Sequence, residues 1–163
     1  MDILLSIPTL LMAIAIVSTL GPTVMNLLIA ITISQIPGFT RIVRSSVLSV
    51  VGEDYIEAAK MGGSSDLRII MHDVLPNAIG PIIVQGTMAI AQMILLAAGL
   101  SFIGLGVQPP TPEWGTMLNQ ARDYMQEYPY LVTIPGIAIA ISAFSINLVG
   151  DGLRDALDPK LKN

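Results

Sequence analysis

Long stretches without a charged side chain dominate the sequence. Residues 3–40, 74–112 and 128–150 contain no Asp, Glu, Lys or Arg. Each stretch can hold at least one helix of about 20 residues, which is the length that crosses roughly 30 Å of hydrocarbon. The pattern therefore predicts an all-α protein with several membrane spans.

Four spans follow from these stretches. Gly21-Pro22 divides the first one, because proline cannot continue a helix and glycine permits a turn. The predicted spans are residues 3–20, 24–39, 79–103 and 131–149. A proline-rich segment separates the last two and favours a stiff extended loop at residues 106–129.

A polar island at residues 41–77 separates the second and third spans. It predicts a hairpin of two short helices, residues 46–61 and 65–75, with Gly62-Gly63 as the stop between them. Pro76 is expected to prevent the second helix from continuing. One face of that helix is apolar, with the spacing i, i+3, i+4, i+7: Leu67, Ile70, Met71 and Val74. Such a face needs a cover, which favours a docking site for a soluble partner.

Composition and charge agree with a membrane protein and orient it. Hydrophobic residues make up 53% of the chain, charged residues 12%, and mean hydropathy is +0.71. Four spans place the island and the C-terminal tail on one side, together with seven of the eight basic residues, and only Arg122 on the other. Because basic residues concentrate on the cytoplasmic side, the island is predicted to be cytoplasmic and the 106–129 loop extracytoplasmic.

Residues for catalysis are scarce. Cysteine is absent, and His72 is the only histidine, so no metal site is expected. The glycines of GLSFIGLG resemble a phosphate loop, but no Lys-Ser or Lys-Thr follows them, so the chain is expected to have no nucleotide site. We therefore expect a protein that is not an enzyme and binds no cofactor itself.

Polar residues inside the spans are neutral: Asn26, Thr32, Gln35, Gln85, Gln92 and Asn147. This argues against a proton relay or an ion-coupled carrier, which usually needs carboxylates in the membrane. The amides can line a solvated path, for which Gln85 and Gln92 are the candidates, or they can form hydrogen bonds between helices. Both alternatives stay open.

The island resembles the EAA loop of ATP-binding-cassette (ABC) importer permeases. That pattern is Glu-Ala-Ala, three residues, Gly, nine residues, then Ile-x-Leu-Pro. The matching residues are Glu57, Ala58, Ala59, Gly63, Leu75 and Pro76, and Asp73 replaces the isoleucine. The segments LSFIGLGVQPPTPEWG and GDGLRDALDP are similar to the second inner-membrane subunit of dipeptide, oligopeptide and nickel importers. The resemblance covers nearly the whole chain and the C-terminal four of the family's six helices.

The resemblance implies how such a subunit works. The EAA loop is a coupling helix that sits in a cleft of a cytoplasmic ATPase, where Glu57 pairs with a basic residue. Ala58 and Ala59 allow close approach, Gly63 makes the bend, and Pro76 passes the movement into the third span. A chain limited to four helices is not expected to form a closed translocation path by itself.

The implied assembly lies in the inner membrane of a bacterial or archaeal cell and contains no nucleic acid. Its partners are a homologous permease, two ATPases that bind ATP and Mg, and an extracytoplasmic binding protein that contacts the 106–129 loop. The implied solutes are short peptides, glutathione or nickel chelates. An alternative is a membrane scaffold that uses the same hairpin to recruit a soluble protein without moving solute. An intramembrane enzyme is the least supported alternative.

Overall fold

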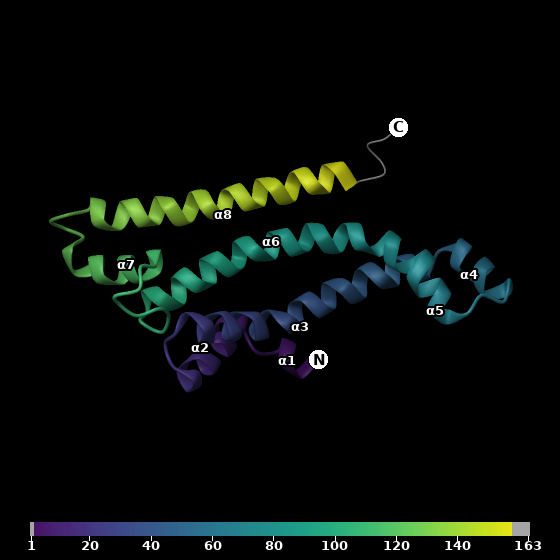
Figure 1. Ribbon diagram of the computed structural model, residues 1–163, viewed down its shortest axis with the longest axis horizontal. Coiled ribbons are helices and arrows are strands. Elements are labelled where there is room, and N and C mark those ends of the chain that lie inside the picture. The colour runs from purple at the N-terminus through teal and green to yellow at the C-terminus, as the bar shows by residue number, and fades with distance from the viewer. Residues whose placement is uncertain (1, 158–163) are drawn as a thin grey trace.

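A computed structural model describes residues 2–157 and shows three long helices side by side (Figure 1). These are α3 (Val24–Val51), α6 (Leu75–Phe102) and α8 (Tyr130–Leu157), each of 28 residues. α6 lies in the middle and packs against both of the others. A helix of this length extends about 42 Å, which exceeds the thickness of the bilayer hydrocarbon.

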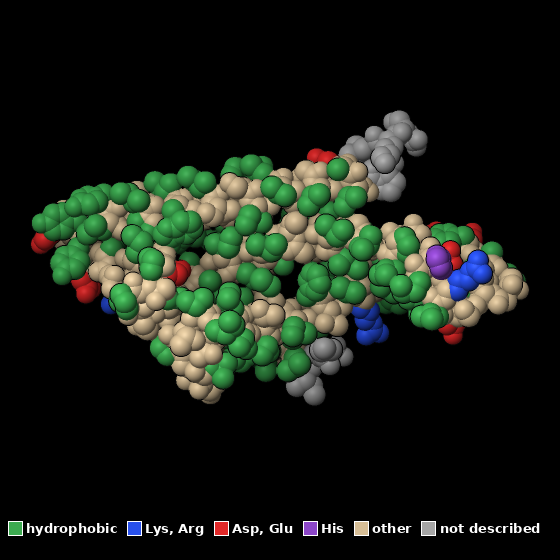
Figure 2. Space-filling view, in the orientation of Figure 1, with side chains coloured by type: hydrophobic (Ala, Val, Ile, Leu, Met, Phe, Trp, Pro, Cys, Tyr) green, Lys and Arg blue, Asp and Glu red, His purple; other side chains and the backbone are tan. Residues whose placement is uncertain are grey.

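The surfaces of these helices suit a membrane. Three helical segments are long and apolar enough to span one: residues 24–51, 66–102 and 130–157. In their most apolar windows only 28, 17 and 17% of the residues, respectively, are buried, so most apolar side chains face outward. On the face shown in Figure 2, hydrophobic side chains cover the long helices, whereas charged side chains lie mainly toward the two ends. The expected all-α, multi-pass membrane architecture is confirmed.

The first expected span is broken and short. Residues 6–8 separate α1 (Asp2–Leu5) from α2 (Thr9–Leu20), and α2 packs beside α3. Pro8 interrupts the helix because it has no N–H to donate. The 12 residues of α2 extend about 18 Å, so this helix by itself is shorter than the hydrocarbon layer.

The predicted turn after this helix is confirmed. Gly21 has φ +91°, a backbone conformation that glycine adopts without strain. The Asn26 side chain donates hydrogen bonds to the carbonyl oxygens of Leu20, at 2.7 Å, and Gly21, at 3.2 Å. The hydroxyl of Thr23 accepts from the Asn26 N–H and caps α3.

α3 continues well beyond the predicted end at residue 39. It runs through the buried Pro37 and past Arg41 and Arg44 to Val51, so the first hairpin helix begins at Asp54 and not at residue 46. A charged residue ends the part of a helix that can lie in hydrocarbon, but it does not end the helix itself. The predicted end of the helix at residue 39 was therefore wrong.

Pro76 does not stop the second hairpin helix, contrary to the prediction. α5 (Asp66–Ile69) passes through a π-helical turn, η1 (Ile70–Val74), directly into α6. The N–H of Leu75 donates to the carbonyl of Ile70, five residues earlier, which widens the turn just before the proline ring. The Asn77 side chain donates to the Asp73 carbonyl at 2.6 Å. The extra residue in this turn lets the helix accommodate Pro76.

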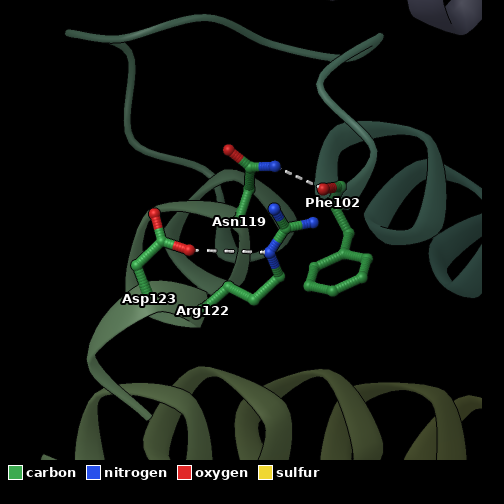
Figure 3. A network of polar contacts seen from close by, with 4 residues as sticks. All are labelled: Phe102, Asn119, Arg122 and Asp123. Atoms are coloured by element: carbon green, nitrogen blue, oxygen red, sulfur yellow. Dashed lines mark hydrogen bonds and ion pairs between the residues drawn. The ribbon is translucent and has the colours of Figure 1, made fainter.

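The predicted 106–129 loop contains a helix that was not predicted, because the proline-rich segment before it favoured an extended loop. α7 (Trp114–Ala121) is followed by the short 3₁₀ helix η2 (Arg122–Tyr124) and packs against α6 and α8. The Glu113 carboxylate caps α7 by accepting from the Thr116 N–H at 2.7 Å. Asn119 donates to the carbonyl of Phe102 at 2.5 Å, which attaches α7 to the end of α6 (Figure 3).

α8 also exceeds its predicted end. It continues from residue 149 to Leu157, and Gly150 allows it to approach α6 closely. A Cβ at Gly150 would lie 2.8 Å from the Thr87 hydroxyl oxygen. Lys160 and Lys162, which contribute to the predicted charge distribution, lie outside the described residues.

Candidate functional site

The polar island forms a hairpin that extends beyond one end of the helix bundle (Figure 1). The hairpin consists of α4 (Asp54–Met61), a glycine turn, α5 and η1. It has a small core of its own, made of Val50, Ile56, Ile69, Val74 and Ala78, in which Ile56 is fully buried. Because this core includes residues of α3 and α6, the hairpin is joined firmly to two long helices.

α4 ends at the predicted Gly62-Gly63 stop, and the glycine turn there is a Schellman motif. Gly63 has φ +78°. Its N–H donates to the Lys60 carbonyl at 3.0 Å, and the Ser64 N–H donates to the Ala59 carbonyl at 3.1 Å. These two bonds satisfy carbonyl groups that the end of α4 would otherwise leave without a partner.

The predicted coupling residues fall into two groups. Glu57 and Ala58 are exposed on α4, Ala59 is half-buried against the hairpin core, and Gly63 is exposed at the turn. Leu75 and Pro76 are exposed at the base of the hairpin, where η1 meets α6. The helix and turn thus form one surface at the tip, and the Leu-Pro pair lies at the junction with the bundle.

The apolar face of the second hairpin helix differs from the prediction. Leu67, Ile70 and Met71 are exposed, by 71, 51 and 53%, whereas Val74 is buried. Ile69, which was not predicted, is the other buried residue of this segment. The π-helical turn explains the difference, because it places residues five apart in register, and the predicted spacing assumed 3.6 residues per turn. The hairpin therefore has an inner apolar side and a second, uncovered one.

Hairpin charges have no ionic partner within the described part of the chain. Between residues 2 and 157, the ion pair found joins Arg122 to Asp123, at 3.8 Å between Nε and Oδ1 (Figure 3). This pair follows α7, at the end of the molecule opposite the hairpin (Figure 1). Both of its side chains are largely exposed, so it contributes little to stability. Glu57, Lys60 and Arg68 are thus free to pair with another molecule.

A groove between α3 and α6 contains the two glutamines predicted for the solute path. Its volume is about 450 Å³, and Gln85 and Gln92 line it together with Gln35 of α3. A second groove of about 500 Å³ is lined by Gln35 and Gln92 and by Thr9 and Leu10 of α2. Figure 2 shows the surface hollowed between the two long helices. The sequence identified Gln35 as a neutral polar residue of a span. Its position opposite α6 could not be predicted, because that position depends on how the helices pack.

A further cavity of about 650 Å³ lies between the start of α6 and the end of α8. Its lining includes Asn77 and Arg154. Gln85 lines both this cavity and the groove between α3 and α6. The start of α6 is thus open on two sides.

Comparison with known proteins identifies the protein family of this chain. Residues 1–163 match the family described as "binding-protein-dependent transport system inner membrane component". The chain belongs to this family of transport permeases, and three apolar helices of spanning length agree with a multi-pass membrane protein.

Individual relatives are similar over the whole chain. The di/tripeptide transport system permease protein DppC of Pseudomonas aeruginosa (strain UCBPP-PA14) is 52% identical over 163 residues, which are 100% of this chain and 54% of that protein. The dipeptide permease DppC of Alkalihalophilus pseudofirmus is 51% identical over 99% of this chain and 53% of that protein. The glutathione permease GsiD of Escherichia coli O1:K1 / APEC is 47% identical over 99% of this chain and 53% of that protein. The chain thus spans about half the length of the curated relatives it matches.

Proposed function

We propose that the chain acts as a permease subunit of an ABC importer and forms part of the translocation path for short peptides or a related solute such as glutathione or nickel. The family match and the names of the relatives support this class. The observation that carries the mechanism is the folded hairpin, whose outer surface displays Glu57 and an uncovered apolar side. Such a surface suits a groove on a soluble protein.

In this proposal the hairpin transmits movement from a cytoplasmic ATPase. ATP and Mg bind to two ATPase subunits, and closure of these subunits moves α4. The hairpin core joins α4 to α3 and α6, so displacement of the hairpin is transferred to two long helices at once. A rigid connection of this kind can switch a path between two states, provided that the ATPase contacts differ between them.

The remaining partners occupy other surfaces. A homologous permease and other helices of the assembly cover apolar sides of the long helices, which are mostly uncovered here. The end that carries α7 faces an extracytoplasmic binding protein. Its exposed aromatic residues are suited to a membrane interface or to a protein contact: Trp114, Tyr124, Tyr128 and Tyr130. Gln85 and Gln92 line the solute path.

Sidedness gives a direct test of this orientation. Single cysteines at Lys60 and Arg68 are expected to react with a membrane-impermeant thiol reagent only from the cytoplasmic side, in vesicles of known orientation. A cysteine at Glu127 should react only from the opposite side. The chain has no cysteine of its own, so each label reports one position. Labelling of Lys60→Cys from outside would reverse the proposed orientation.

Glu57→Lys is expected to reduce substrate-stimulated ATP hydrolysis by the assembled transporter at least tenfold. A partly desolvated carboxylate that pairs with a basic residue contributes far more than an exposed pair, and charge reversal turns this attraction into repulsion. Hydrolysis is measured in proteoliposomes with the binding protein and solute present. Asp155→Lys makes the same charge change at an exposed position of α8, outside both the hairpin and the α7 end, and should leave stimulation unchanged.

The same experiment distinguishes a transporter subunit from a membrane scaffold that moves no solute. A scaffold would retain its soluble partner through the hairpin and would show no ATP hydrolysis that depends on solute. If the purified complex contains no ATPase, or if Glu57→Lys leaves coupling intact, the proposed role of the hairpin is wrong.

A further inference from the structure

Three glutamine side chains in the long helices lack a hydrogen bond within residues 2–157. They are Gln35, Gln85 and Gln92. Several hydroxyl groups near them bond locally to a backbone carbonyl three or four residues earlier. Ser34 donates to Ile31 and Thr40 to Ile36, both at 2.8 Å, and Thr87 donates to Val84 at 2.7 Å. The glutamine amides are thus distinct from these polar groups.

The three glutamines share one surface. Gln85 and Gln92 are seven residues apart on α6, so they lie two helical turns, or about 10 Å, apart on the same side. Gln35 reaches the same groove from α3. Gln35 and Gln92 also line the neighbouring groove beside α2, which places this pair where the two grooves meet. The arrangement is a row of amides along a continuous depression.

The chemistry of the row fits a peptide bond. Each glutamine offers two N–H donors and a carbonyl acceptor, which complement the C=O and N–H of a peptide unit. Among the described residues, no charged side chain lines either of these two grooves. The row therefore does not discriminate by the charge of a side chain or a terminus. An amide without a partner is costly at membrane depth, so each glutamine requires water, a ligand or a polar group of another helix in the assembly.

We propose that Gln35, Gln85 and Gln92 bind the backbone amides of a short peptide as it passes through the permease. This inference rests on the proposed importer function and narrows its substrate class to solutes that contain a peptide bond. The groove of about 450 Å³ is within the size range of small-ligand sites. The Gln35–Gln92 pair is the specificity-determining element, since both side chains border both grooves.

Transport of paired substrates tests the proposal. A dipeptide is compared with its ester analogue, in which an oxygen replaces the peptide N–H, in proteoliposomes that contain the whole transporter. The affinity of the binding protein for each compound is measured separately, and the transport rates are corrected for the difference in affinity. The intact permease should favour the dipeptide about fivefold, which is the effect of one hydrogen bond. Gln35→Leu and Gln92→Leu should each reduce this preference, and the double variant should abolish it.

The control is Asn147→Leu. Asn147 is an exposed amide of α8 that also lacks a hydrogen bond in the described chain and lines none of the three cavities above. Its replacement should leave the preference unchanged. If the intact protein and the Gln35→Leu/Gln92→Leu double variant favour the dipeptide over its ester analogue equally, the proposed role of the glutamines is wrong. If the intact transporter moves neither compound but moves another solute, the peptide assignment itself fails.

Access from water provides a second test. Gln35→Cys and Gln92→Cys are expected to react with a small water-soluble thiol reagent in the assembled transporter, and a transported dipeptide in excess should slow the reaction at least threefold. Absence of reaction at both positions would mean that another helix of the assembly fills the grooves. That result would overturn the proposal, since a covered glutamine cannot contact solute.

Discussion

Gly115→Ala is expected to detach α7 from the bundle and to lower the free energy of unfolding by about 3 kcal/mol. A Cβ at Gly115 would lie 2.7 Å from the Cα and 2.9 Å from the carbonyl carbon of Ala98. Both atoms belong to the backbone of α6, which cannot move aside as a flexible side chain can. The added methyl group therefore forces α7 away from α6.

Thermal unfolding of the purified transporter and hydrogen exchange at residues 114–121 measure this effect. Exchange should become faster in α7 and remain slow in the middle of α6. The matched control is Gly136→Ala, because a Cβ at Gly136 in α8 meets no described atom within 4 Å. Alanine there favours the helix and should leave stability equal or higher by up to about 1 kcal/mol. Equal stability of the two variants would show that α7 does not pack closely against α6.

Loss of this contact should also affect function at a distance from the solute groove. α7 is attached to the bundle by the Asn119 hydrogen bond to Phe102 and by Thr116, which donates to the carbonyl of Val107 at 2.6 Å. In the proposed orientation these bonds hold the surface that meets the binding protein. Gly115→Ala should therefore weaken stimulation by the binding protein while basal ATP hydrolysis persists.

Sequence alone identified the features that depend on composition and on local backbone chemistry. Long charge-free stretches gave the second, third and fourth spans, because transfer of apolar side chains into hydrocarbon supplies most of the free energy that inserts a span. The Gly62-Gly63 pair gave the turn of the hairpin, because the left-handed conformation of Gly63 is a property of a few neighbouring residues. These signals require no knowledge of the tertiary structure.

Features that depend on contacts between distant segments were missed. The π-helical turn lets the chain pass Pro76 without a break, and the usual helical period could not reveal it. α7 follows three prolines, and its position depends on contacts with α6. Gln35 joins Gln85 and Gln92 only because α3 packs beside α6. The candidate coupling residues were predicted from a motif, whereas the uncovered side of the hairpin could be identified only from the structure.

Gly63→Pro is expected to abolish substrate-stimulated ATP hydrolysis while leaving the membrane bundle intact. Proline fixes φ near −65°, whereas Gly63 has φ +78°, so the turn cannot keep its conformation. Proline also removes the N–H that donates to the Lys60 carbonyl. Both losses fall at the end of α4, so Glu57 and Ala58 would no longer be presented in a fixed orientation to the ATPase.

Matched variants distinguish a local loss of the turn from general unfolding. Gly63→Asn should retain most of the coupling, because asparagine tolerates the left-handed conformation and keeps the N–H. Thermal unfolding should be nearly unchanged in both variants, since the turn is exposed and does not line the groove between α3 and α6. Normal coupling in Gly63→Pro would mean that the tip of the hairpin does not transmit force. Movement would then have to enter the bundle at its base, near Leu75 and Pro76.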